Sequence, residues 1–170
     1  MTKTSLRSTF LAALFITTFI SCAEKKPFQV TDCISDVKAV VDDWHNAAAE
    51  ADFERYFGHF ADSSSIFMGT DATERWNVTE FKAYSKPYFD RGTAWNFTPL
   101  TRHVYISENG KTAWFDEELS TPNLGPSRGT GVLVLKNEVW KIAHYNLTVP
   151  IPNPIMGDVK KQIEEELNKN

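Results

Sequence analysis

Two stretches in the C-terminal half of this 170-residue chain, 112–121 and 140–149, have the alternating side-chain pattern of β-strands. One face of the stretch 140–149 starts with an indole and ends with groups that hydrogen-bond or titrate: Trp140, Ile142, His144, Asn146 and Thr148. The same period of two in the stretch 112–121 places Trp114, Asp116 and Glu118 on one face. A few polar groups among large apolar ones are typical of a pocket wall, so these strands are expected to line a ligand site.

One interpretation of this set is catalytic. A carboxylate in a mostly apolar cavity is a stronger base than in water, and Asp116, Glu118 or Asp71 could serve as that general base. His144 or Tyr56 would then polarise a substrate carbonyl. We therefore assign Asp116, Glu118 and His144 as candidate catalytic residues.

A second interpretation of the same residues is structural or ligand-binding. Arg128 would pair with Asp116 or Glu118, while His144 and Asn146 would satisfy backbone groups at the wide end of the fold. The sequence leaves both interpretations open. Whether the protein is an enzyme is therefore uncertain from sequence.

Composition bounds the classes of ligand. The chain has a formal net charge of −4 and no run of basic residues, which argues against nucleic-acid binding. Its two cysteines, Cys22 and Cys33, form no CxxC or zinc-ligand spacing. We predict no metal and no cofactor.

The N-terminus has the pattern of an export signal. Lys3 and Arg7 precede an apolar run from Phe10 to Ile20, which is short for a permanent membrane span. A small residue before Cys22 resembles the bacterial lipoprotein signal, in which that cysteine is lipidated. We predict a signal peptide over 1–22, a tether over 23–30, and a lipid-anchored domain over 31–170 in the bacterial cell envelope, facing the periplasm or the exterior.

Helical spacing dominates the first half of the domain. An apolar stripe from Ile34 to Ala48 predicts a first helix, and aromatic spacing over 53–60 predicts a second. Asn77 with Glu80 three residues later predicts a capping box that starts a third helix, which Pro87 should kink or end. Apolar residues from Met156 to Leu167 predict a closing amphipathic helix.

Strand signals fill the second half. A short strand over 63–68 precedes the third helix, and further strands are expected over 95–106, 112–121, 131–135 and 140–149. Glu108-Asn109-Gly110-Lys111 is a strong hairpin signal. This order predicts one α+β domain with an antiparallel sheet.

The order of elements and four local strings are similar to one family. The strings are FMGTDATERW (67–76), AWFDEEL (113–119), RGTGVLVL (128–135) and WKIAHYNLTVPIPN (140–153). They resemble the nuclear transport factor 2-like (SnoaL-like) domains. The resemblance implies a cone-shaped fold in which three N-terminal helices pack on a curved antiparallel sheet, with the C-terminal helix added.

The resemblance also implies where a pocket would lie. If the face carrying Trp140, Ile142, His144 and Asn146 is concave, we expect ligand-binding positions from three regions of the chain: Tyr56, Asp71, Trp76, Trp114, Arg128, Trp140 and Asn146. The implied function is binding of a small, partly apolar molecule; the alternative is an isomerase, dehydratase or cyclase with a carboxylate base. An apolar outer face carrying Phe115, Leu133, Leu135, Tyr145 and Leu147 would suit a homodimer.

Overall fold

The computed structural model describes residues 30–169. The predicted signal peptide, Cys22 and nearly all of the tether therefore lie outside the described residues. Within them, no helix is long and apolar enough to cross a membrane.

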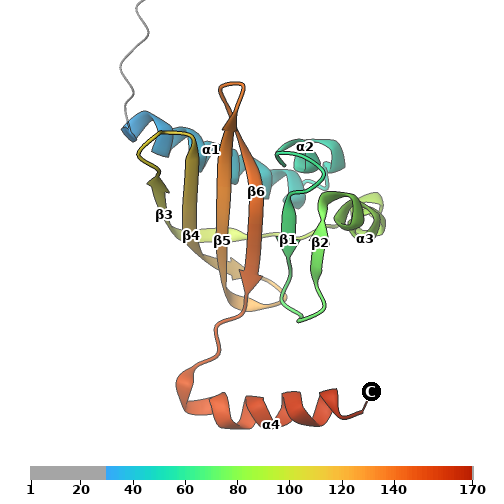
Figure 1. Cartoon of the computed structure of the whole chain (residues 1–170). Coiled ribbons are helices and arrows are strands. Elements are labelled where there is room, and N and C mark those ends of the chain that lie inside the picture. The colour runs from blue at the N-terminus through green and yellow to red at the C-terminus, as the bar shows by residue number, and fades with distance from the viewer. Residues whose placement is uncertain (1–29, 170) are drawn as a thin grey trace, which may run out of the picture.

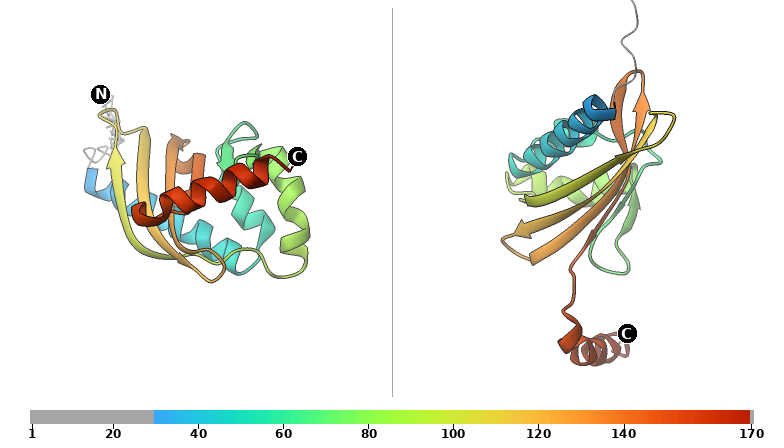
Figure 2. Two further views of the ribbon diagram at one scale, coloured as in Figure 1. Left: turned by 90° about the horizontal axis from the view of Figure 1, so that it is seen from below. Right: turned by 90° about the vertical axis from the view of Figure 1, so that its left-hand side faces the viewer.

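Three helices, two of them ahead of the first strand, cover one face of the sheet (Figures 1 and 2). They are α1 (Val30–Ala49), α2 (Phe53–Gly58) and α3 (Val78–Asp90). The predicted capping box is confirmed: Asn77 accepts from the Glu80 amide at 3.0 Å, and the Glu80 carboxylate accepts from the Asn77 amide at 2.9 Å. Pro87 does not end α3, which continues for three more residues.

The sheet has six strands in the order β2-β1-β6-β5-β4-β3. Their bounds are β1 (Ile66–Met68), β2 (Arg75–Asn77), β3 (Thr98–Ile106), β4 (Thr112–Thr121), β5 (Gly125–Lys136) and β6 (Val139–Thr148). Strand β2 is an addition to the prediction, and the pairing of β1 with β6 is parallel, whereas the other pairs are antiparallel. The predicted α+β class with a curved sheet is confirmed.

A short 3-10 turn, η1 (Asn153–Ile155), leads to the predicted C-terminal helix α4 (Met156–Leu167). Figures 1 and 2 show α4 standing apart from the layer of sheet and helices. Its apolar stripe is exposed at Met156, Ile163 and Leu167.

A β-bulge in β6 decides which side chains face the helices. Val132 of β5 pairs with His144 and Leu133 pairs with Ile142, so Ala143 has no partner across the ladder. One extra residue shifts the alternation by one position. Trp140 and Ile142 are buried before the bulge, and Tyr145 and Leu147 are buried after it.

The bulge overturns the predicted concave face. Strict alternation assigned His144 and Asn146 to the side of Trp140, but after the bulge they lie on the convex face. On β4 the buried residues are Ala113, Phe115, Glu117, Leu119 and Thr121, so the predicted wall is wrong there too. Trp114, Asp116 and Glu118 lie on the outer face instead, and Arg128 is opposite Glu118 in the register.

The residues predicted to form an apolar dimer surface do not lie on the outer face of the sheet. Phe115, Leu133, Tyr145 and Leu147 belong to the core, with Leu135 packed against it. The convex face exposes instead a stacked pair, Tyr105 and Trp114, whose ring centroids are 5.7 Å apart. Self-association through this face stays a prediction.

Two glycines of β5 make room for large side chains on the concave face. A Cβ on Gly129 would lie 2.2 Å from the Tyr145 hydroxyl and 2.6 Å from Glu117 Oε1. A Cβ on Gly131 would lie 2.5 Å from the Phe115 ring. These glycines are required for close approach and not for an unusual backbone angle.

Glu117 is a fully buried carboxylate that joins the sheet to α1. Its Oε1 accepts from the Tyr145 hydroxyl at 3.0 Å and lies 2.9 Å from His45 Nε2. Its Oε2 accepts from Arg102 Nε at 2.8 Å, and Arg102 Nη1 reaches Asp42 of α1 at 2.5 Å. Although burial acts to raise the pKa of Glu117, the bonds to His45 and Arg102 prevail and hold it below the ordinary value.

The first prediction concerns this network. Glu117→Gln removes the buried anionic partner of the almost buried Arg102 guanidinium and leaves it only the exposed Asp42, so we expect a loss of about 3 kcal/mol in unfolding free energy. Urea denaturation followed by circular dichroism measures it. The matched control, Glu118→Gln on the convex face, should change stability by less than about 0.5 kcal/mol. Equal effects of the two variants would contradict the network's role.

The second prediction concerns pH. Burial lowers the pKa of His59 and, together with the charge of Arg75, that of His144; the bond from Arg55 lowers that of Asp43. With Glu117, all four groups have depressed folded-state pKa values. In acid, the unfolded chain therefore binds more protons than the folded protein. The stabilisation that each group contributes is complete above its unfolded-state pKa and is lost as the pH falls through its folded-state pKa.

Stability should consequently fall from about pH 6.5, where unfolded histidines titrate, and fall further below about pH 4.5 as carboxylates protonate. Urea midpoints measured from pH 8 to pH 3 test this. His59→Asn should reduce the loss of stability that begins at about pH 6.5, whereas His103→Asn, on the exposed face of β3, should leave that loss unchanged. A flat profile down to pH 5 would contradict the assignment.

Candidate functional site

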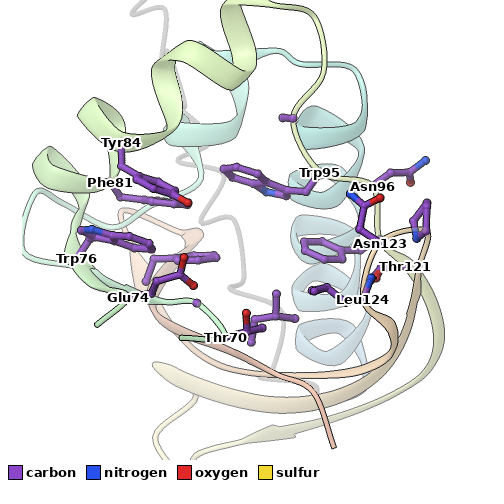
Figure 3. Close-up of a pocket in the computed structure, with 16 residues that line it drawn as sticks. Thr70, Glu74, Trp76, Phe81, Tyr84, Trp95, Asn96, Thr121, Asn123 and Leu124 are labelled. Carbon is purple, nitrogen blue, oxygen red and sulfur yellow. The ribbon is translucent and has the colours of Figure 1, made fainter. Parts of the chain in front are cut away.

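A cavity of about 410 Å³ opens at one end of the fold, beside the short strands β1 and β2 (Figure 3). Its walls come from β1, β2, α3, the segment 94–97, the β4–β5 turn and the end of β6. The sixteen lining residues are Phe67, Gly69, Thr70, Glu74, Trp76, Phe81, Tyr84, Ala94, Trp95, Asn96, Phe97, Thr121, Pro122, Asn123, Leu124 and Leu147.

Stacked aromatic rings form one wall. The Phe67 and Phe81 rings lie 4.0 Å apart and nearly parallel, and Trp76 stacks on Tyr84 at 4.4 Å. Trp95 continues the group, 5.7 Å from Phe81. These residues are brought together because β1 and β2 pair Phe67 with Trp76, while one face of α3 presents Phe81 and Tyr84 to them.

A second layer fixes the orientation of Trp95. Its indole N–H donates to the Tyr56 hydroxyl at 3.3 Å, and Tyr56 is buried against Trp44. Burial raises the pKa of Tyr56 well above its ordinary value, so its hydroxyl stays protonated. Tyr56 thus supports the wall from behind and does not itself line the cavity.

The turn between β1 and β2 positions the carboxylate of Glu74. The turn is closed by Gly69 N–H donating to the Glu74 carbonyl at 2.9 Å and by Glu74 N–H donating to the Asp71 carbonyl at 3.0 Å. Asp71 accepts from the Thr73 amide and hydroxyl, and these bonds lower its pKa. Glu74 Oε2 accepts from the Asp71 amide at 3.2 Å, which directs the side chain back across the turn.

Hydrogen-bonding groups line the opposite wall, from the β4–β5 turn. The Thr121 hydroxyl accepts from the Leu124 amide at 2.9 Å, and Gly125 follows with a positive φ of 70° that allows the tight return into β5. Asn123 and Leu124 are thereby presented to the cavity (Figure 3). Leu124 is 40% exposed, so this wall forms part of the open side.

The lining chemistry is apolar with a few placed polar groups. Among these sixteen residues Glu74 is the one carboxylate, and none is a lysine, arginine or histidine. Burial, then Tyr88 and Glu74, raises the pKa of Tyr84 to about 12, so its phenol is a neutral donor. Within residues 30–169, no cluster of three or more metal-ligand side chains occurs.

The predicted site residues divide into three places. Trp76 lines the cavity, and Asp71 lies in the turn beside it with its carboxylate held by Thr73. Tyr56 and Trp140 are buried in the core. The others lie on the convex face, outside the cavity: Trp114, Asp116, Glu118, Arg128, His144 and Asn146.

Several lining residues were missed. Glu74 was included only as part of the string over 67–76, and Trp95 only as the first residue of the strand expected over 95–106. Thr121 was expected only as the last residue of a strand, and Asn123 and Leu124 lie in the segment that follows it, for which no site was predicted. The available signal was the odd-numbered face of β4, which ends at Thr121.

Comparison with known proteins identifies the family. The SnoaL-like domain matches residues 37–152, and none of the curated proteins compared with the chain matches it. A candidate dehydratase of the NTF2-like family from Streptomyces avermitilis superposes with a TM-score of 0.63 and 14% identity, over 73% of this chain and 100% of that one. An NTF2-like protein of unknown function from Pseudomonas putida gives 0.60 and 13%, over 72% and 90%.

At these identities the two structures are evidence for the fold alone. The family assignment comes from the domain match, which spans most of the described residues and all of the sheet. The chain therefore belongs to the family of SnoaL-like domains.

Proposed function

We propose that this protein binds a small, partly apolar molecule in the cavity between the aromatic wall and the β4–β5 turn. The cavity volume of about 410 Å³ falls within the range of small-molecule sites, roughly 300–1,000 Å³. Its lining combines six aromatic rings with a few oxygen and amide groups, which is the composition of such sites.

One observation supports the proposal above the others: several aromatic rings beside the cavity are not fully buried by the protein. Phe67 and Phe81 are buried, but Trp76 and Trp95 are only half-buried, and Tyr84 is 40% exposed. A ligand that removes the remaining surface of these rings from water would gain binding free energy.

A catalytic role is the alternative, and the structure changes its basis. Asp116 and Glu118 lie on the convex face, and His144 lies there too. Glu117 is inward but is engaged by Arg102, His45 and Tyr145. An isomerase, dehydratase or cyclase with a pocket carboxylate would therefore have to use Glu74.

The third prediction tests binding. N-phenyl-1-naphthylamine, a neutral apolar probe, should show saturable fluorescence enhancement with the purified full-length protein. Leu124→Trp fills the open side of the cavity and should weaken this binding about tenfold or more, in line with loss of a buried aromatic contact. Titration of the probe emission measures it.

The control is Leu100→Trp, because Leu100 is 63% exposed on β3 and does not line the cavity. This variant should bind the probe like the parent protein. Loss of binding in both variants, or in neither, would contradict the proposed site.

We further propose that the domain acts in the bacterial cell envelope, attached by a lipid on Cys22. The support is the pattern of residues 1–22, with its basic start, apolar run and terminal cysteine. Lipidation plus a short tether would leave the domain next to a membrane surface.

The fourth prediction follows from this proposal. In bacterial cells supplied with an alkyne fatty acid, the parent protein should become labelled and sediment with membranes. Cys22→Ser should remove the label and release the protein from the membrane fraction, whereas Cys33→Ser should not change either result. Label that persists in Cys22→Ser would disprove the assignment.

A further inference from the structure

The charge of the cavity lining is one-sided. Glu74 contributes a carboxylate, and none of the fifteen other lining residues carries a basic side chain. Tyr84 is held in its neutral form. An anionic ligand would meet one like charge and no compensating cation, which is costly in a mostly apolar site.

Glu74 has no cationic partner among the described residues. Its Oε2 accepts from the Asp71 amide at 3.2 Å, and the carboxylate also lies close enough to the neutral Tyr84 phenol to help raise the pKa of that phenol. The adjacent Arg75 lies on the opposite face of β2, where its charge contributes to the lowered pKa of His144. The carboxylate is thus an uncompensated negative group at an apolar cavity.

The absence of a side chain at Gly69 makes room for this carboxylate. A Cβ on Gly69 would lie 2.2 Å from Glu74 Oε2 and 2.9 Å from its Cδ, so only glycine allows Glu74 to fold over this position. In Figure 3 the carboxylate lies on the same side of the cavity as Trp76, Phe81 and Tyr84. A ligand against the aromatic wall would therefore also be near Glu74.

The aromatic rings of the cavity also favour a cationic ligand over an anionic one. Indole and phenol rings attract cations through the negative potential of their faces, and the indole of tryptophan does so more strongly. Trp76, Trp95 and Tyr84 are the rings that keep exposed surface at the cavity. Carboxylate and rings together favour positive charge.

We propose that the cavity selects a small organic cation, specifically a quaternary ammonium group joined to an apolar or aromatic body. A quaternary nitrogen has no N–H groups, so apolar walls leave none of its donors unsatisfied. Its charge is balanced by Glu74, and the hydroxyl and amide groups of Thr121 and Asn123 remain for a polar substituent. This inference rests on the proposed binding function.

The fifth prediction compares two probes of the same shape. Phenyltrimethylammonium and its carbon isostere, tert-butylbenzene, differ only in charge. Competition against N-phenyl-1-naphthylamine on the full-length protein should show the cation binding about tenfold more tightly, the scale of a partly desolvated cation–π and ion-pair site. Glu74→Gln should remove most of this difference, whereas Glu118→Gln, on the convex face, should keep it.

The outcomes separate this inference from the proposed function. If the neutral isostere competes as well as the cation, or if Glu74→Gln keeps the cation preference, the charge selectivity is wrong while the binding site stands. If neither compound displaces the naphthylamine and its binding is insensitive to Leu124→Trp, both proposals fail. Circular dichroism melts of each variant confirm that the fold is retained before binding is compared.

Discussion

A single unpaired residue, Ala143, determines the chemistry of the concave face. Because the bulge inserts one residue into β6, Trp140 and Tyr145 point to the same side although they are an odd number of residues apart. At this point β6 also changes neighbours: Ile142 exchanges backbone bonds with His59 and Ala61, and β1 takes over from His144 onward. The bulge thus lets one strand serve two partners and brings the Tyr145 hydroxyl to Glu117.

That placement gives the interior a buried charge that is engaged on every side. A carboxylate removed from water costs several kcal/mol unless charges and donors replace the solvent. Here Arg102 supplies the charge, and His45 and Tyr145 supply further contacts, so α1, β3, β4 and β6 are joined through one side chain. Because the ionised carboxylate only accepts hydrogen bonds, His45 Nε2 must carry the proton that faces it. The network lies behind the cavity wall, since Phe97, which lines the cavity, packs edge-on against His45 at 5.4 Å.

Every α-helix and strand except β2 was predicted from sequence, whereas the inward face of the sheet was assigned wrongly. Capping by Asn77 and Glu80, the Asn109-Gly110 turn and the apolar spacing around Trp44 are local signals, and each local signal matched the structure. The facing of His144, by contrast, depends on a bulge that no residue between Trp140 and Thr148 announces. The glycines of RGTGVLVL were the available clue: Gly129 and Gly131 mark the side of β5 that large residues from neighbouring strands approach, and the opposite residues of β4, Phe115 and Glu117, are therefore inward.

The position of the cavity follows from the lengths of the strands. Strands β3 to β6 are long enough for their concave side chains to meet α1, but β1 and β2 have three residues each. They can present only Phe67 and Trp76 to the interior, and α3 adds Phe81 and Tyr84 from the other side. The aromatic stack therefore ends before the space between the β1–β2 and β4–β5 turns is filled. The remaining space is bordered by aromatic rings on one side and by Glu74 at the β1–β2 turn. Because β1 and β2 are short, their connecting turn reaches this space, and the Glu74 carboxylate gives the cavity a negative charge.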